Sequence, residues 1–385
     1  MKNSRYSKSR QKVCSSCAAA KAKCDRAQGR CSRCTKRDLQ CDFTGSSTEH
    51  RASRTVLSLS HDNGTITNTA LPHDGAGASS SHLDFSGLDL VCTINADDIR
   101  ARWLYNLVPV AGQMPKEYPA GITNFIAKTL NAYSSTAMKG RDLPPFIHPL
   151  QLTNTAAMQP LAMCLSLLQA CPTLGEGPAP TTVAALIKNE MASLYQNRHL
   201  YDELSMLAAF QALLVYAMAF FFRLGGRSDP YLKGAIQNLQ DLAGLSARHG
   251  LVCRNEQCNT RPTWESWIIA ETKRRTLYTL YLFDNVLSAV DATPTTMGTE
   301  LEGLPAPSSK VLWEASSRQD WEAAYNLHIM DWPSGGLRLD ELWPVPAGLD
   351  SAAIQERRRR VEQWVESVDV YGTMMHAVTS CTYGS

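Results

Sequence analysis

The stretch CSSCAAAKAKCDRAQGRCSRCTKRDLQC, residues 14–41, holds six of the twelve cysteines of this 385-residue chain. Their spacing is C-x2-C-x6-C-x6-C-x2-C-x6-C, and the second half repeats the first at an offset of 17 residues. Neighbouring positions repeat as well, since Ser15 and Asp25 recur as Ser32 and Asp42. The repeat predicts two similar halves, each with a helix and a strand-like segment, related by approximate two-fold symmetry.

The cysteine cluster favours metal binding over disulfide formation. The chain starts Met-Lys-Asn-Ser-Arg with no apolar segment after it, so we expect no secretory signal and no oxidising compartment. Tetrahedral zinc takes four ligands, so six thiolates satisfy two ions only when two of them bridge both ions. The symmetric choice for the bridges is Cys14 and Cys31. The predicted ligands of two zinc ions per chain are Cys14, Cys17, Cys24, Cys31, Cys34 and Cys41.

Two other arrangements of the same cysteines are conceivable. A disulfide knot requires secretion. A single mononuclear finger built from the two C-x2-C pairs would leave Cys24 and Cys41 unused, although they occupy equivalent positions in the repeat. Apart from Val13, Leu39 and Phe43 the segment has almost nothing apolar to bury, so metal binding must supply its folding free energy.

Charge and composition divide the chain into three zones. Residues 1–41 contain twelve Lys/Arg and two Asp, a formal +10, and the rest carries 26 basic against 34 acidic residues, or −8. A basic head on an acidic body is expected when one end meets a polyanion. Residues 44–88 contain 20 Ser, Thr or Gly among 45 residues, which predicts a flexible linker. The predicted domains are therefore a zinc cluster at 1–43, the linker at 44–88 and a regulatory domain at 89–385.

The third zone has the periodicity of an all-α domain. Leu204 to Phe222 is free of charges and long enough to cross a membrane, but Ser205 and Gln211 interrupt it and apolar helical segments flank it. We therefore expect a buried core helix and no membrane. The predicted helices are 121–138, 154–170, 181–200, 203–223, 231–249, 262–290, 310–328 and 352–380.

With Lys21-Ala22-Lys23-Cys24-Asp25 inside it, the six-cysteine segment resembles the fungal binuclear zinc cluster transcription factors. The resemblance implies a nuclear, RNA polymerase II-type regulator, an activator by expectation, that works with the transcription machinery. It implies binding to double-stranded DNA with CGG-type half-sites and is compatible with a pathway-specific regulator of a metabolic gene cluster, as in secondary metabolism. No enzyme is expected, because the chain lacks G-x-S-x-G, Walker A, H-E-x-x-H and Rossmann fingerprints.

In that family the helix after the second cysteine enters the major groove, and a lysine four residues after that cysteine reads a CCG-type triplet. Lys21 occupies this position, and a basic side chain there can donate to guanine O6 and N7. Ala18 and Ala20 stand where family members usually have Arg or Lys, and Gly29 stands where they usually have proline. These departures bear on affinity. The other predicted DNA contacts, mainly with phosphate, are Lys23, Arg26, Arg10, Lys12, Arg33, Lys36 and Arg37.

Three questions stay open at the level of sequence. The cluster could instead staple a protein-interaction regulator that does not bind DNA. No coiled-coil heptads follow the cluster, so the chain binds as a monomer or forms a homodimer through its helical body. Finally, one segment has aromatic and charged residues at helical spacing and also resembles the regulatory regions of these factors. These residues are Trp264, Trp267, Glu271, Arg274/Arg275 and Tyr278. They predict a core helix with an ion pair, or an effector or partner surface.

Overall fold

The computed structural model describes residues 14, 16, 17, 20, 22–25, 31–37, 39, 83–105, 116–174 and 180–383. The chain divides into two compact units, Met1–Ala78 and Ser79–Ser385. In the first unit the longest described element is helix α2, Ser32–Lys36. The second unit is largely helical, which confirms the predicted combination of a small cysteine cluster and an all-α body.

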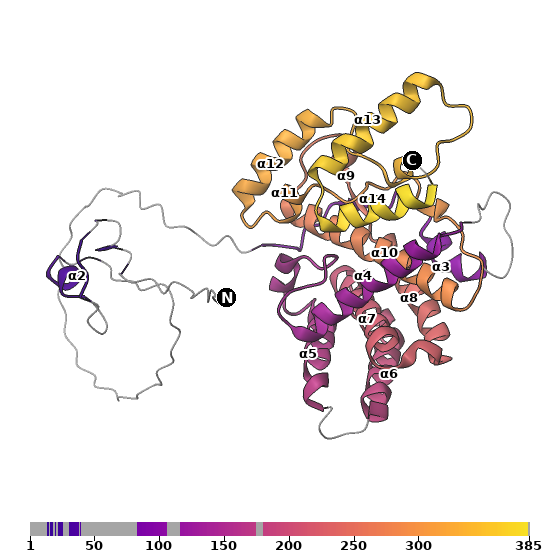
Figure 1. Ribbon diagram of the computed structural model, residues 1–385, viewed down its shortest axis with the longest axis horizontal. Helices are drawn as coiled ribbons and strands as arrows, with labels where there is room; N and C mark the ends of the chain where they lie inside the picture. Colours follow the sequence, from indigo (N-terminus) through magenta and orange to yellow (C-terminus); the bar gives the residue numbers. More distant parts are fainter. Residues whose placement is uncertain are drawn as a thin grey trace, which may run out of the picture. The chain divides into compact units, whose positions relative to one another are not determined.

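The first half of the second unit is built around helix α7, which contacts α4, α5, α6 and α8. Figure 1 shows these helices grouped together in the magenta-to-red part of the chain. The elements of this half are β1 (Leu90–Val91), α3 (Ala96–Tyr105), α4 (Ala120–Lys139), η1 (Pro149–Thr153), α5 (Gln159–Leu174), α6 (Pro180–Gln196), η2 (Arg198–Leu200), α7 (Glu203–Arg223), η3 (Gly226–Ser228) and α8 (Tyr231–Arg248).

The second half is organised by the long helix α10, which contacts α4, α7, α8 and α12 and so joins the two halves (Figure 1). Strand β2 pairs antiparallel with β1, and this two-stranded ribbon is the one sheet among the described residues. The elements are β2 (Val252–Cys253), α9 (Arg254–Gln257), α10 (Trp264–Val290), η4 (Thr299–Leu301), α11 (Lys310–Trp313), α12 (Arg318–Asp331), η5 (Leu339–Leu342), α13 (Ser351–Ser367) and α14 (Val370–Tyr383).

Helix α7 is the core helix that the sequence predicts. It is long and apolar enough to cross a membrane, but 94% of its 18-residue apolar window is buried inside the fold. The carboxylate of Asp202 begins the helix by accepting a hydrogen bond from Ser205 N (2.8 Å). Buried Gln211 donates to Phe146 O (3.1 Å) and accepts from Gln151 (2.7 Å), so its amide is satisfied away from water.

Helix α10 is buried on nearly all sides, and it places charged side chains in the core. Glu271 accepts from both Arg274 (2.9 Å) and Arg275 (2.7 Å), which confirms the predicted ion pair and extends it. Arg275 reaches Asp369 (2.6 Å) and Arg274 reaches Glu256 (3.2 Å), so each buried guanidinium has two carboxylate partners. Such pairing offsets the desolvation that burial imposes on the charges.

Two predicted helices are each split in the structure. The segment predicted at 310–328 forms α11 and α12, because Ser317 starts a new helix by accepting from Asp320 N (3.1 Å). The segment predicted at 352–380 forms α13 and α14. Asp369 lies between them, accepts from Gly372 N (2.9 Å) and faces Arg275. Helix α3 was not predicted, since its apolar face is too short to give a clear period.

The packed body begins before the predicted boundary at residue 89. Leu83 and Phe85 are buried in its hydrophobic core, although both fall within the Ser/Thr/Gly-rich segment predicted as linker. Two apolar residues in a polar stretch are enough to dock it, and composition averaged over 45 residues does not show this. Residues 40–82, which include most of the linker predicted at 44–88, lie outside the described residues.

Candidate metal centre

The second half of the cysteine repeat is organised around α2. Cys31 is the residue that precedes this helix, and Cys34 lies within it with its side chain buried. The carboxylate of Asp25 accepts from Ser32 N at the helix start (3.0 Å). Since a helix N-terminus leaves backbone N–H groups without partners, this contact ties the end of the first half to the helix of the second.

The backbone reproduces the 17-residue repeat that the sequence predicts. Ala22 N donates to Cys17 O (3.0 Å), and its counterpart Leu39 N donates to Cys34 O (2.9 Å). A second pair of equivalent bonds joins Ala20 N to Ser16 O (3.4 Å) and Arg37 N to Arg33 O (3.1 Å). The two halves therefore share a local fold as well as a spacing.

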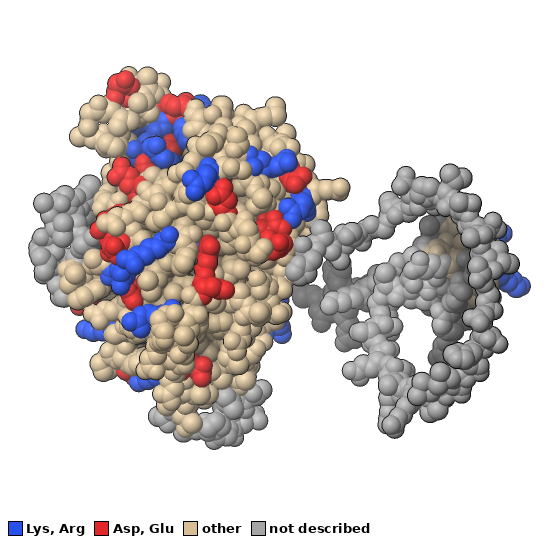
Figure 2. Space-filling view, turned by 180° about the vertical axis from the view of Figure 1, so that it is seen from behind, with Lys and Arg blue, Asp and Glu red and all other residues tan. Residues whose placement is uncertain are grey.

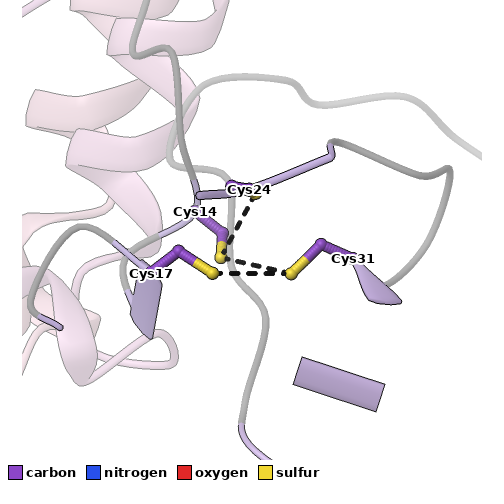
Figure 3. A group of neighbouring side chains, drawn as sticks. All are labelled: Cys14, Cys17, Cys24 and Cys31. Carbon is purple, nitrogen blue, oxygen red and sulfur yellow. Dashed lines mark hydrogen bonds between the residues drawn. The ribbon is translucent and has the colours of Figure 1, made fainter. Parts of the chain in front are cut away.

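Four thiols converge on one point (Figure 3). The sulfur atoms of Cys14, Cys17, Cys24 and Cys31 all lie within 4.8 Å of one another. The Sγ–Sγ distances are 3.9 Å for Cys14–Cys31, 3.6 Å for Cys17–Cys31 and 3.9 Å for Cys24–Cys14. A tetrahedral zinc with bonds of about 2.3 Å holds its sulfur ligands about 3.8 Å apart. The spacing fits zinc, and it is well above a disulfide bond of about 2.05 Å.

Cys14 has thiols of both halves beside it. Its Sγ is 3.9 Å from Cys24 in the first half and 3.8 Å from Cys34 in the second. A thiolate that bridges two ions needs such a position, so the distances are those that the predicted role of Cys14 requires. Cys41, the sixth predicted ligand, lies outside the described residues.

The Cys17 thiol shows why this centre depends on metal. Desolvation raises the pKa of the Cys17 thiol to about 11, the Cys14 thiol adds to the rise, and the Arg33 guanidinium opposes it. Without a cation the Cys17 thiol therefore keeps its proton at neutral pH. Zinc binds thiolates, so its uptake releases protons and its binding free energy becomes folding free energy.

Arg33 has a contact that the sequence does not reveal. Its Nη1 donates to Ser16 O (3.5 Å) and to Cys17 Sγ (3.7 Å), and its side chain is half-buried. The guanidinium thus faces the sulfur cluster from the second half, where it can support the negative charge of the thiolates. The repeat gave no hint of this, because the equivalent position in the first half is Ser16.

The structure describes only some of the other residues that are predicted to contact DNA. Lys23, Lys36 and Arg37 are exposed, as a residue that meets phosphate must be. The remaining predicted contacts lie outside the described residues: Arg10, Lys12, Lys21 and Arg26.

The second unit presents a different electrostatic surface. On the face drawn in Figure 2, Lys and Arg alternate with Asp and Glu over the helical body. Its conspicuous histidine, His148, is buried and serves the fold. Its Nδ1 accepts from Leu150 N (3.2 Å), which leaves Nε2–H to donate to Trp313 O (3.0 Å).

The comparisons with known proteins agree with the metal centre, and the family match is confined to the part of the chain that contains it. Residues 12–50 match the family described as the fungal Zn(2)-Cys(6) binuclear cluster domain. That domain binds two zinc ions through six cysteines, as the arithmetic of ligands predicts. No curated protein and no solved structure matched the chain.

Proposed function

We propose that this chain, which carries a fungal Zn(2)-Cys(6) binuclear cluster domain at residues 12–50, is a zinc-dependent regulator of transcription that binds DNA sequence-specifically. The domain supports this proposal, because it is typical of the fungal zinc-cluster transcription factors, which are regulators and typically not enzymes. The observation that carries the proposal is the convergence of four thiols at zinc-ligand spacing within the most basic part of the chain. Two ions shared by six cysteines would hold a small basic fold rigid enough to enter a groove of DNA.

The proposed division of labour separates the base-reading residue from the residues that meet the backbone. Lys21 reads a guanine of a CGG-type half-site through O6 and N7. The exposed Lys23, Lys36 and Arg37 bind phosphate, together with Arg10, Lys12 and Arg26. Arg33 supports the thiolates, since its guanidinium already faces Cys17, and contributes to the basic surface from there. Cys14 and Cys31 are the proposed bridging ligands, and Cys41 completes the set.

A gel shift over a range of salt concentrations tests this proposal. Full-length protein should bind a CGG half-site duplex more tightly than a scrambled duplex, and affinity should fall steeply with salt. Lys21→Ala should cost about 1–3 kcal/mol on the CGG duplex and reduce its advantage over the scrambled one.

Lys23→Ala is the matched control, two residues along the chain and exposed. It should weaken both duplexes alike and lower the salt slope by about one. Equal affinity for both duplexes in the wild-type protein, or unchanged discrimination in Lys21→Ala, would sink the base-reading role.

One alternative is favoured by a specific feature. Ala18 and Ala20 make the recognition segment less basic than is usual for the family, which suits a zinc-stapled regulator that binds proteins and not DNA. That function predicts two zinc ions per chain with negligible DNA affinity even at low salt. The gel shift at low salt therefore decides between the two.

Downstream of DNA binding, we propose a nuclear activator that recruits the transcription machinery and controls a metabolic gene cluster. A reporter with CGG half-sites should rise with the wild-type protein and stay at background with Cys34→Ala. For the oligomeric state we propose that any homodimer forms through the helical body. Sedimentation should then show that the 1–90 fragment is a monomer, whereas any dimer should be found only with the full-length chain.

A further inference from the structure

A cavity of about 230 Å³ lies within the second unit, apart from the metal centre. Helices α10 and α12 form part of its wall, and segments 303–309 and 334–338 form another part. All of these wall residues belong to the part of the chain that the structure describes. Its size is about one and a half times the roughly 150 Å³ that holds a benzene ring.

Aromatic rings line this cavity in a connected series. Trp267 contacts Trp321 behind the wall, with 5.6 Å between ring centroids, and Trp321 contacts Tyr325 at 5.0 Å. His328 lies 5.5 Å from Tyr325 and 6.3 Å from Trp332, so α12 and the residue that follows it present a run of rings. Rings in series offer a face on which a flat ligand can stack.

Several polar atoms at the cavity have no partner within the described part of the chain. The hydroxyl of Tyr325 and both ring nitrogens of His328 make no hydrogen bond there, although both side chains line the cavity. The Ser308 hydroxyl and Arg274 Nε are buried and likewise unpartnered. A buried polar group without a partner costs about 1–3 kcal/mol, so the Ser308 hydroxyl and Arg274 Nε favour a ligand that satisfies them, and the Tyr325 hydroxyl and His328 ring offer further hydrogen-bonding atoms at the same wall.

The backbone around Ser308 is held in place by the ion network of α10. Ser308 N donates to Glu271 (2.9 Å), and Ser308 O accepts from Arg275 (3.4 Å). These bonds fix the main chain and leave the side-chain hydroxyl uncommitted. The cavity wall is therefore preformed, which lowers the entropy cost of binding.

The charges at the cavity are already neutralised. Arg274 pairs with Glu256 (3.2 Å) and Glu271 (2.9 Å), and Glu256 also accepts from Cys253 N (2.8 Å). Desolvation lowers the pKa of His328, so its imidazole is neutral at physiological pH. A charged ligand would bring an unpaired ion into this site, which costs more than it returns.

We propose that this cavity is a binding site for a small, neutral aromatic compound of one or two rings that carries a hydrogen-bonding group. The ligand stacks on the rings of α12 and bonds to Tyr325, His328 or Ser308. The site lies in the helical body and does not involve the zinc ligands or the DNA-contacting residues. It therefore stands or falls independently of the proposed DNA binding.

Calorimetric titration of the full chain with defined probes tests the proposal. Indole and 4-ethylphenol are the neutral aromatic probes, benzoate and benzylammonium are the charged controls, and cyclohexanol tests the need for a ring. The two neutral aromatic probes should bind with Kd values of about 1 mM or tighter, which their small size permits. The other three should bind at least tenfold more weakly.

Three variants locate the site. Tyr325→Phe removes a hydroxyl that has no hydrogen-bond partner among the described residues, so it should keep the unfolding midpoint and weaken the binding of 4-ethylphenol roughly fivefold. A Cβ on Gly336 would stand 3.6 Å from His328 Nε2, and Gly336 has no positive φ, so Gly336→Val should fill the space and abolish binding. Leu327→Ala changes an exposed residue on the same helix and should bind as the wild type does.

Each outcome decides for or against the site. Binding of the neutral probes that falls in Tyr325→Phe and Gly336→Val but not in Leu327→Ala supports it. The proposal is overturned when neither neutral probe binds, when benzoate or benzylammonium binds more tightly, or when all three variants bind as the wild type does. Thermal unfolding without probe identifies a variant that is merely unfolded, in which case Tyr325→Phe alone carries the test.

Discussion

The two units of this chain reach a stable fold by opposite routes. In the first unit the buried core is a group of cysteine side chains, with Leu39 packed against it. In the second unit the core is a large hydrophobic cluster in which α7 and α10 are almost wholly buried. The first fold thus depends on a metal, and the second depends on packing and on a paired ion network. Each unit should therefore respond to a perturbation that leaves the other unchanged.

Zinc removal should give the largest effect, and only in the first unit. Structural zinc contributes about 10–16 kcal/mol, far more than the few apolar side chains there can supply. A chelator should abolish hydrogen-exchange protection at Leu39 N, which bonds to Cys34 O. All eight tryptophans lie in the second unit, so tryptophan fluorescence reports its unfolding separately. The urea midpoint of the second unit should not change on chelation. Hydrogen-exchange protection at Leu39 N that survives chelation would contradict the account.

Glu271→Ala should destabilise the second unit by about 3–5 kcal/mol, because it leaves Arg274 and Arg275 buried with fewer carboxylates. Urea unfolding followed by tryptophan fluorescence measures this, and the zinc content should stay at the wild-type value. Glu356→Ala is the control, since Glu356 pairs with Arg359 at the exposed surface (2.7 Å), where solvent screens the pair, and should leave the urea midpoint nearly unchanged. Similar losses for both variants would show that burial does not set the energetics.

The stability of the second unit should fall on mild acidification. Burial lowers the pKa of His148 to about 4 from its ordinary 6.5. The unfolded chain takes up the proton as pH falls through 6.5, whereas the folded chain resists until about pH 4. Its contribution is therefore complete above pH 6.5 and is lost between 6.5 and 4, by up to about 3 kcal/mol.

Urea unfolding at pH 7.0 and pH 4.5 checks this prediction in the wild type and in His148→Gln. The variant should lose less stability than the wild type between the two pH values, because it lacks the titrating imidazole. An identical loss in both proteins would assign the acid sensitivity to other groups.

Arg33→Gln should weaken zinc binding by roughly 10- to 100-fold, as is usual when a side chain that supports a metal ligand is removed. The reason is the contact of Arg33 Nη1 with Cys17 Sγ. Competition with a chromogenic chelator measures the affinity. Arg37→Gln removes an exposed charge from the residue that follows the same helix and should retain zinc as the wild type does. Equal retention in both variants would leave Arg33 without a supporting role.

The same contrast explains what sequence could and could not predict. The spacing of the six cysteines along the chain determines the cluster, so the two-ion centre follows from the number of ligands that each zinc needs. The period of apolar residues gave α7 its observed bounds, 203 to 223, and the Glu271 ion pair follows from helical spacing. The starts of new helices at Ser317 and Val370 depend on single capping and tertiary contacts, which a periodic pattern averages away.

Contacts between distant residues were beyond the reach of the sequence. Asp369 meets Arg275 across 94 residues, and no local pattern announces it. The guanidinium of Arg33 faces Cys17 only because the two halves fold against each other. Leu83 and Phe85 dock on the body although their surroundings have the composition of a linker. Side chains whose partners are remote need the tertiary structure to be understood.

Fluorescence anisotropy of a labelled CGG half-site duplex, during zinc titration of metal-free full-length protein, tests the central claim most directly. It reads the number of ions and DNA binding in one signal. The account predicts that DNA binding becomes complete only at the second equivalent of zinc, because the fold needs both of the ions that share the cluster's thiolates. Full binding at one equivalent, or none at two, would contradict it.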